Sequence, residues 1–155
     1  MEFRAIDVVK DRETIIAFRK DSYVVSFGSE EGFGDADVYV TRLANRAKRF
    51  PDGLMLIEEN GQPIGQIELQ IVSYEGTDIG YVNLFYLIPS YRGKGLGREL
   101  VAYAEHFFER YGVKSYQLRV APTNGPALRL YEKIGLRLLA KENQPYAVWL
   151  MMKDL

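Results

Sequence analysis

Residues 88–98, IPSYRGKGLGR, combine three alternating glycines with three cations. They follow an apolar run and precede a helical pattern, where a helix presents unpaired backbone N–H groups and the positive end of its dipole. Glycine lets a ligand approach the backbone closely, and Arg92, Lys94 and Arg98 add positive charge. The stretch favours an anion such as a pyrophosphate, although the glycines alone are equally typical of a strand–helix turn with solvated basic side chains.

Two familiar phosphate-binding loops do not match this stretch. A P-loop needs a Gly-Lys pair followed by Ser or Thr, whereas Gly93-Lys94 is followed by Gly95. A dinucleotide fingerprint has the pattern Gly-x-Gly-x-x-Gly, but here Gly93, Gly95 and Gly97 alternate and Arg98 occupies the place of the third glycine. Nucleoside triphosphate hydrolysis and hydride transfer are therefore disfavoured.

A second stretch with chemical potential is NGPALRLYEKIG, residues 124–135. Asn124 is a typical helix N-cap, and Tyr131 follows it by seven residues, which places both on one helix face about 10 Å apart along the axis. A Tyr hydroxyl, with an unperturbed pKa of about 10, can donate a proton in catalysis. The helical spacing of Tyr131 also fits an aromatic side chain packed in the core. The chain has 11 tyrosines, so a tyrosine at such a position need not be catalytic.

Composition excludes several other chemistries. The chain has no Cys and a single His, His106, so disulfides, thiolate nucleophiles and Cys–His zinc sites are excluded, and we expect no metal site. His106 falls outside the apolar stripe of its predicted helix, which favours a solvated side chain over a member of a catalytic triad.

Charge and hydropathy limit the partners. The formal net charge of −1 provides no global positive field, so we expect neither nucleic acid nor a membrane as partner. The longest apolar runs, AVWLMM and LFYLI, are far shorter than the roughly 18 residues of a membrane span. The start, MEFRAIDVVKDRE, lacks the apolar core of a signal peptide, which predicts a cytoplasmic protein. A length of 155 residues with 47% hydrophobic residues fits one domain, residues 1–155.

Hydrophobic periodicity predicts the elements that position these residues. Helical patterns cover 12–27, 37–50 and 95–111, and a fourth runs from Asn124 as N-cap to Gly135 as C-cap. Strand patterns cover 54–59, 64–72, 79–88, 115–120, 136–142 and 146–152, with turns at NGQP, YEGTD and NQP. A strand–helix–strand unit in a strand-rich chain predicts an α/β fold, a mixed sheet covered by helices.

The glycine stretch resembles the motif of the GNAT superfamily, the acyl-CoA-dependent N-acyltransferases, which is Arg/Gln-x-x-Gly-x-Gly/Ala after a strand ending in Val-x-Pro. The matching positions are Arg92, Gly95, Gly97 and Pro89, with Leu87 in place of Val. The second stretch resembles a later motif of that family, Asn-x-x-Ala-x-x-x-Tyr-x-x-x-Gly-Phe. It matches at Asn124, Ala127, Tyr131 and Gly135, with Leu136 in place of Phe.

The resemblance implies a GNAT-like, mostly antiparallel sheet of six to seven strands flanked by about four helices. The implied order is one strand, two helices, three strands, a helix, a strand, a helix and two strands. It also implies that acetyl-CoA, as co-substrate, lies between the strands at 79–88 and 115–120. The pyrophosphate would bind the turn formed by Arg92, Gly93, Lys94, Gly95, Leu96, Gly97 and Arg98.

The same resemblance assigns the rest of the cofactor site. Backbone groups of Phe85 and Leu87 would pair with the pantetheine arm as an added strand does. Asn124 would contact that arm or serve mainly as a cap, and Tyr131 would protonate the departing thiolate.

The general base is less evident. Many family members carry an acid on the strand before the glycine turn, but residues 81–88 contain none, and Asn83 stands in that region. Glu68 on the preceding strand, or a chain of water molecules, are the candidates. The alternation of Glu68 with Ile67 and Leu69 equally suits a side chain that faces solvent.

The acceptor region is expected around the first two helices and their connection. That segment carries the carboxylates Glu30, Glu31, Asp35 and Asp37, which either attract a cationic amine or form a solvated acidic loop. The aromatic residues Tyr23, Phe27, Phe33 and Tyr39 either line a cleft or, for the first two, face the core.

These features predict an N-acetyltransferase that moves an acetyl group from acetyl-CoA to a primary amine, on a small molecule or a peptide. Without Cys or a placed Ser–His pair, direct attack within a ternary complex is favoured over an acyl-enzyme. The alternative is a non-catalytic acyl-CoA-binding or interaction module. The chain is expected to be a monomer or homodimer. The apolar run YAVWLMM either lies in the core or forms a dimer contact, and the core is favoured because a terminal strand this apolar would otherwise be an exposed edge.

Overall fold

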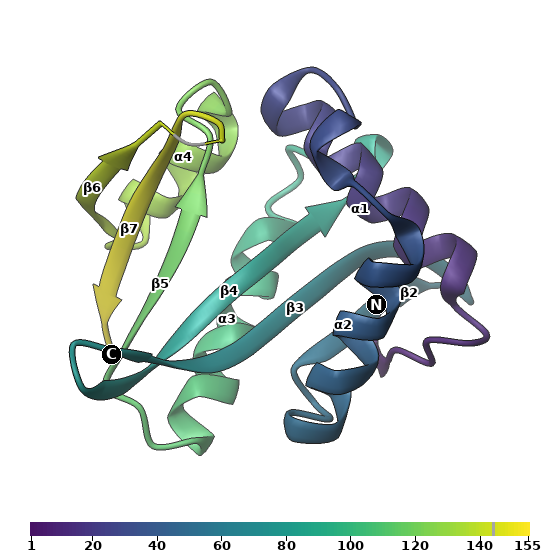
Figure 1. Cartoon of the computed structure of the whole chain (residues 1–155), viewed down its shortest axis with the longest axis horizontal. Helices are drawn as coiled ribbons and strands as arrows, with labels where there is room; N and C mark the ends of the chain where they lie inside the picture. Colours follow the sequence, from purple (N-terminus) through teal and green to yellow (C-terminus); the bar gives the residue numbers. More distant parts are fainter. Residues whose placement is uncertain (144) are drawn as a thin grey trace.

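The computed structural model describes residues 1–143 and 145–155, and these form a seven-stranded sheet with four α-helices (Figure 1). The strands are β1 (Glu2–Ala5), β2 (Leu54–Glu59), β3 (Gln62–Tyr74), β4 (Thr77–Leu87), β5 (Ser115–Val120), β6 (Arg137–Glu142) and β7 (Val148–Asp154). The α-helices are α1 (Arg12–Phe27), α2 (Ala36–Arg49), α3 (Leu96–Arg110) and α4 (Gly125–Lys133). Short 3-10 helices, η1 (Glu31–Phe33) and η2 (Pro89–Tyr91), follow α1 and β4.

The predicted elements and their order are confirmed, and where a range was predicted its boundaries differ by up to about two residues. The first strand, β1, was implied by the resemblance without a range. The turn predicted at 143–145 includes residue 144, which lies outside the described residues. None of the helices in the described part of the chain is both long and apolar enough to cross a membrane.

The strands lie in the order β1-β2-β3-β4-β5-β7-β6, and every neighbouring pair is antiparallel except β4 and β5. These two parallel strands share only three residue pairs, from Gly80–Tyr116 to Val82–Leu118, and then diverge (Figure 1). A β-bulge sits at the same level, because Leu84 pairs with Glu68 and Val82 with Leu69, which leaves Asn83 as the extra residue on β4.

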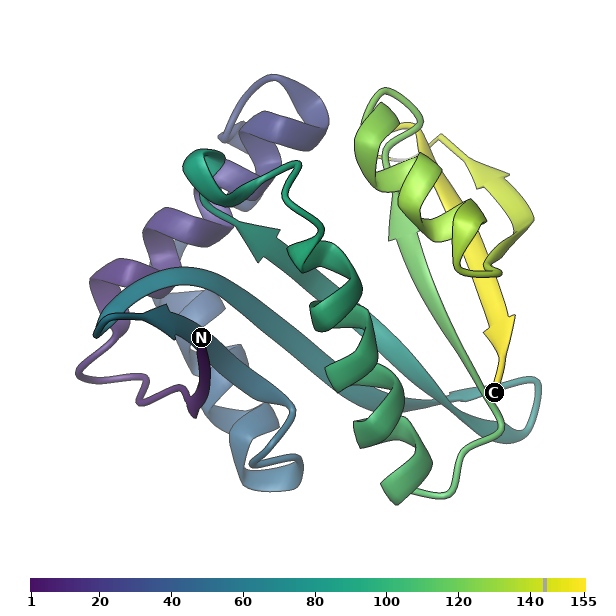
Figure 2. The same ribbon diagram turned by 180° about the vertical axis from the view of Figure 1, so that it is seen from behind.

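Helices cover both faces of the sheet. α1 and α2 lie on one face, while α3 and α4 lie on the other (Figures 1 and 2). The apolar stripe of α3 buries Leu100, Val101, Ala104, Phe107 and Phe108 in the larger hydrophobic cluster, which also includes β-strand residues and Tyr131. A separate cluster beneath α1 and α2 is formed by Ile15, Tyr39, Leu43, Leu54 and Leu56.

The last strand of the chain is internal to the sheet. β7 pairs with β5 on one side and β6 on the other, so Leu150 and Met151 are buried, and the predicted core location of this strand is confirmed for them. The edge strand beside β7 is β6, which leaves Leu138 and Leu139 exposed.

Candidate functional site

The glycine turn opens α3 and faces solvent. Gly93 and Gly95 have φ values of 74° and 83°, a left-handed conformation that favours glycine, and no atom lies within 4 Å of a Cβ placed at either position. Gly95 is the N-cap of α3 and has no side chain to cap it. Among the described residues, the N–H groups of 93–97 have no hydrogen-bond acceptor, while Arg98 N–H donates to the Gly95 carbonyl at 3.3 Å. The turn therefore presents a row of free donors to an anion.

Arg92 anchors this turn. Its Nε donates to the Leu87 carbonyl at 2.7 Å, and its Nη2 lies 2.9 Å from Asp21 Oδ2 on α1. The same Asp21 oxygen accepts a hydrogen bond from the Tyr86 hydroxyl at 2.6 Å. The charge of Arg92 is thus matched within the protein. Lys94 and Arg98, which form no ion pair among the described residues, are the cations left for a ligand.

Gly97 is required for close packing of two helices and not for a left-handed backbone conformation. A Cβ at this position would lie 2.7 Å from Leu130 Cδ2, so the missing side chain lets the start of α3 approach α4. The sequence predicted Gly97 only as part of the turn expected to bind a pyrophosphate. Its contact with α4 could not be predicted, because the residue spacing within one helix does not indicate which other helix packs against it.

The edge of β4 beyond the three β5 pairs is available for pairing. Ile88 N–H donates to the Ile64 carbonyl at 2.8 Å, and because backbone direction alternates along an antiparallel strand, Phe85 and Leu87 direct their backbone groups away from β3. Those groups therefore face the side on which β5 diverges. The Leu87 carbonyl is already bonded to Arg92, so Phe85 supplies the freer pair of groups.

Asn124 and Tyr131 lie on α4, beside the diverging strands. Asn124 caps the helix by accepting a hydrogen bond from Ala127 N–H at 3.4 Å, which confirms the predicted N-cap. Tyr131 is 9% exposed, and its ring centroid lies 6.3 Å from that of Phe85 on β4. Burial raises the pKa of Tyr131 above its usual value, which keeps the hydroxyl protonated. No hydrogen bond to this hydroxyl occurs within the described part of the chain.

Glu68 belongs to a buried polar cluster beneath α2, so the interpretation of a solvent-facing side chain is wrong. It is 1% exposed, accepts hydrogen bonds from Tyr39 at 2.6 Å and Gln66 at 3.0 Å, and pairs with Arg46 at 3.4 Å. Alternation failed as a guide here because helices cover both faces of β3. Burial and the Glu68 carboxylate raise the pKa of Tyr39, and burial lowers the pKa of Arg46.

Three of the four carboxylates in and next to the connection between α1 and α2 interact with neighbouring groups of the protein. Asp35 caps α2 by accepting a hydrogen bond from Val38 N–H, Asp37 pairs with Arg12, and Glu30 lies 3.9 Å from Lys20. These partners and their exposure favour the solvated acidic loop over a dedicated amine site.

The four aromatic residues of this region form one row. Successive ring centroids from Tyr39 through Phe33 and Tyr23 to Phe27 are separated by 5.3, 6.4 and 5.8 Å. The row continues to Tyr146, whose ring stacks on Phe27 at 4.2 Å. The position of Tyr146 in this row could not be predicted from the sequence, because its contact with Phe27 joins segments more than one hundred residues apart.

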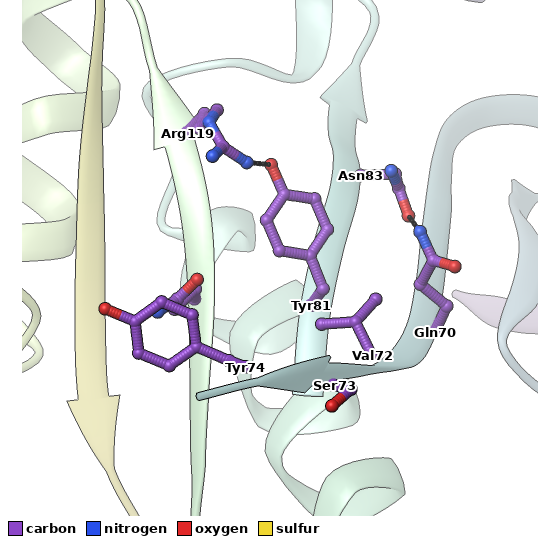
Figure 3. Close-up of a pocket in the computed structure, with 8 residues that line it drawn as sticks. Gln70, Val72, Ser73, Tyr74, Tyr81, Asn83 and Arg119 are labelled. Carbon is purple, nitrogen blue, oxygen red and sulfur yellow. Dashed lines mark hydrogen bonds between the residues drawn. The ribbon is translucent and has the colours of Figure 1, made fainter. Parts of the chain in front are cut away.

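A pocket lies on the α1/α2 side of the sheet where β4 and β5 part (Figure 3). It is lined by Gln70, Val72, Ser73, Tyr74, Tyr81, Asn83, Gln117 and Arg119. Neither Glu68 nor any other carboxylate is among these lining residues.

Comparison with known proteins defines the class. The model of the acetyltransferase (GNAT) family matches residues 14–136, so the chain belongs to this family and the resemblance read from its two motifs is confirmed. An uncharacterised N-acetyltransferase of Methanocaldococcus jannaschii is 27% identical over 108 residues, which cover 68% of this chain and 46% of that protein. The chain spans about half or less of the length of the first curated relatives it matches.

Solved structures agree on the fold. A ribosomal-protein-alanine N-acetyltransferase from Brucella melitensis aligns over 100% of both chains with a TM-score of 0.79 at 20% identity. A PaiA N-acetyltransferase from Thermoplasma acidophilum in complex with coenzyme A aligns over 99% of this chain and 98% of its own, with a TM-score of 0.76 at 23% identity.

Proposed function

We propose that this chain is an N-acetyltransferase that uses acetyl-CoA as co-substrate and transfers the acetyl group to an amine by direct attack in a ternary complex. The observation that carries the proposal is the three-pair junction of β4 and β5, which places a free strand edge between the glycine turn and Tyr131. Membership of the GNAT family and the names of the relatives support it.

The residues present fit acetyl-CoA. The open space before Gly93 and Gly95 and the free N–H groups of 93–97 suit a pyrophosphate, with Lys94 and Arg98 beside it. Phe85 offers backbone groups for the pantetheine amides, as an added strand would require. When bound, acetyl-CoA supplies an acetyl group as a thioester, which an amine can attack. Arg92 and Asn124 act as positioning residues for the turn and for α4 in this assignment.

Tyr131 is assigned as the proton donor. Because burial raises its pKa, the hydroxyl carries its proton at neutral pH and can deliver it to the departing sulfur as the new N–C bond forms and the C–S bond breaks. The proton is recovered from water. Glu68 is bonded to three donors beneath α2 and does not line the pocket, so water is the preferred acceptor for the proton of the amine.

A calorimetric titration of acetyl-CoA, CoA and desulfo-CoA tests the cofactor assignment. Wild type should bind all three, and Gly95→Glu should abolish binding because it places a negative charge and a strained side chain in the turn. The matched control is Gly112→Glu, which makes the same change at a φ of 75° at the far end of α3, again with no atom within 4 Å, and should bind normally. Absence of binding by wild type would overturn the proposal.

The alternative is a non-catalytic acyl-CoA-binding module. The lack of a carboxylate at the pocket favours it. Release of free thiol from acetyl-CoA in the presence of an amine panel separates the two, because a binding module would bind the cofactor and release none. The cytoplasmic location and the monomeric or homodimeric state stay predictions.

A further inference from the structure

The pocket on the α1/α2 side of the sheet holds the side chains nearest to the junction of β4 and β5 on that face. Tyr81 pairs with Gln117 within the junction, and Asn83 is the bulged residue directly beyond it (Figure 3). If the cofactor lies along the diverging edge of β4, an acceptor amine that reaches the thioester from this face must pass these residues.

Two unused hydrogen-bond donors of the pocket lie next to the junction of β4 and β5, on Asn83 and Tyr81. Gln70 Nε2 donates to Asn83 Oδ1 at 2.8 Å, so the amide nitrogen of Asn83 is turned away from Gln70 (Figure 3), and no acceptor for it occurs among the described residues. The Tyr81 hydroxyl accepts a hydrogen bond from Arg119 Nη1 at 2.9 Å, which leaves its own proton to donate. Gln70 Oε1 and Gln117 Oε1, which accept no hydrogen bond from the described residues, are free acceptors of the pocket.

The pocket carries little unmatched charge. Arg119 Nε and Nη2 donate to the two Glu142 carboxylate oxygens at 2.7 and 3.3 Å, so its charge is balanced. Among the described residues, no carboxylate lines the pocket to receive a second ammonium group. A ligand carboxylate or a second cation placed here would lose water without gaining a free opposite charge, which is costly.

We infer that the acceptor is an amine next to a neutral carbonyl group, as in a peptide N-terminus or an amino acid amide, and not a polyamine or a free amino acid. The carbonyl oxygen accepts hydrogen bonds from Asn83 Nδ2 and the Tyr81 hydroxyl, and Gln70 Oε1 accepts from an N–H of the acceptor. This inference rests on the proposed function and names the substrate class for the same site.

The test compares acetylation of trialanine, alaninamide, free alanine, sec-butylamine and putrescine by wild type and Asn83→Asp, with a second set of peptides that begin with Ser or Met. Wild type should prefer the peptides and alaninamide. Asp at position 83 can still accept from Gln70 but replaces the free donor with an anion. It should lower kcat/KM for alaninamide, relative to sec-butylamine, by about tenfold or more, which corresponds to the loss of one hydrogen bond. Comparing the same two acceptors in each variant cancels the difference in amine basicity and any gain from a new base.

Two further variants sharpen the comparison. Tyr81→Phe removes the other donor and should shift the same ratio in the same direction, also if Asn83→Asp fails to fold. The control Asp78→Asn exchanges the same two residue types in the opposite direction at the exposed start of β4. It should leave the kcat/KM for alaninamide relative to sec-butylamine unchanged.

The outcomes separate the inference from the proposed function. Acetyl-CoA binding and acetylation of sec-butylamine or putrescine at rates equal to the peptides would overturn the substrate class and leave the transferase assignment intact. An unchanged ratio in both variants, or cofactor binding with no carbonyl-bearing acceptor acetylated, would also overturn it. Absence of cofactor binding would overturn both.

Discussion

Tyr131 is 9% exposed, and its hydroxyl forms no hydrogen bond among the described residues without being a fully buried atom, so its proton is available to a ligand. Tyr131→Phe keeps the ring against Phe85 and removes only the proton donor. We therefore expect kcat to fall by about 100-fold or more, a typical contribution of general acid catalysis, while acetyl-CoA affinity stays within about twofold. Steady-state kinetics and calorimetric titration measure the two quantities.

Tyr111→Phe is the matched control, because Tyr111 is 41% exposed at the C-terminal end of α3. It should leave kcat unchanged. A Tyr131→Phe enzyme with wild-type turnover would remove Tyr131 from the mechanism and leave it as a core aromatic.

Residue types at the site were predicted better than residue roles. Positive φ values at Gly93 and Gly95 and the N-cap at Asn124 follow from local backbone requirements, so the sequence indicates them directly. The partner of Arg92 could not be predicted, because Asp21 lies 71 residues away on another element. The cofactor roles of all these residues stay predictions.

At the scale of elements, the Glu68 cluster ties α2 to β3. Glu68→Gln removes the charge that pairs with Arg46, and the loss of one partner from a buried pair should lower the free energy of unfolding by about 3 kcal/mol. Because Glu68 does not line the pocket, the folded variant should retain most of its turnover. Urea unfolding and a turnover assay at 15–20 °C measure both.

Asp154→Asn provides the contrast, since it breaks the exposed pair with Arg137, in which the side chains are 71% and 55% exposed. It should cost less than about 0.5 kcal/mol. Loss of turnover in a stably folded Glu68→Gln variant would instead restore Glu68 as a candidate base.

Element type and order followed from periodicity for all elements except β1, which only the family resemblance implied, but the arrangement that forms the site did not. The patterns of β4 and β5 place their residues on strands with nearly correct boundaries. Nothing in either strand marks the end of their pairing at Val82, and a one-residue bulge at Asn83 shifts the side-chain register without a local sequence signal. The divergence of β4 from β5 and the bulge at Asn83 both depend on how neighbouring strands pack, so they cannot be predicted from the sequence of a single strand.

Buried tyrosines link the stability of the whole molecule to alkaline pH. Burial raises the pKa of Tyr39, Tyr86, Tyr116 and Tyr131. In the unfolded chain these groups lose their protons near pH 10, whereas the folded chain retains them, so unfolding releases protons at higher pH. The stabilising effect is complete below about pH 10 and is lost above it, at up to about 1.4 kcal/mol per pH unit for each group.

Urea unfolding at pH 8, 9, 10 and 11 should therefore show a flat region followed by a steep fall. Tyr131→Phe, which loses no hydrogen bond among the described residues, should make the fall shallower. A stability that stays level to pH 11 would contradict the shifted pKa values.

The three-pair junction of β4 and β5 also has a consequence for cooperativity. One part of the sheet, β1–β4, meets the other, β5–β7, through the residue pairs from Gly80–Tyr116 to Val82–Leu118. One hydrophobic cluster nevertheless joins the two parts, since it includes Ile67 and Val82 on one side and Leu118 and Met151 on the other. Differential scanning calorimetry should therefore show a single transition for the free protein, with a ratio of van't Hoff to calorimetric enthalpy near one. A ligand that fills the gap adds the missing strand contacts, so saturating acetyl-CoA should raise the transition temperature.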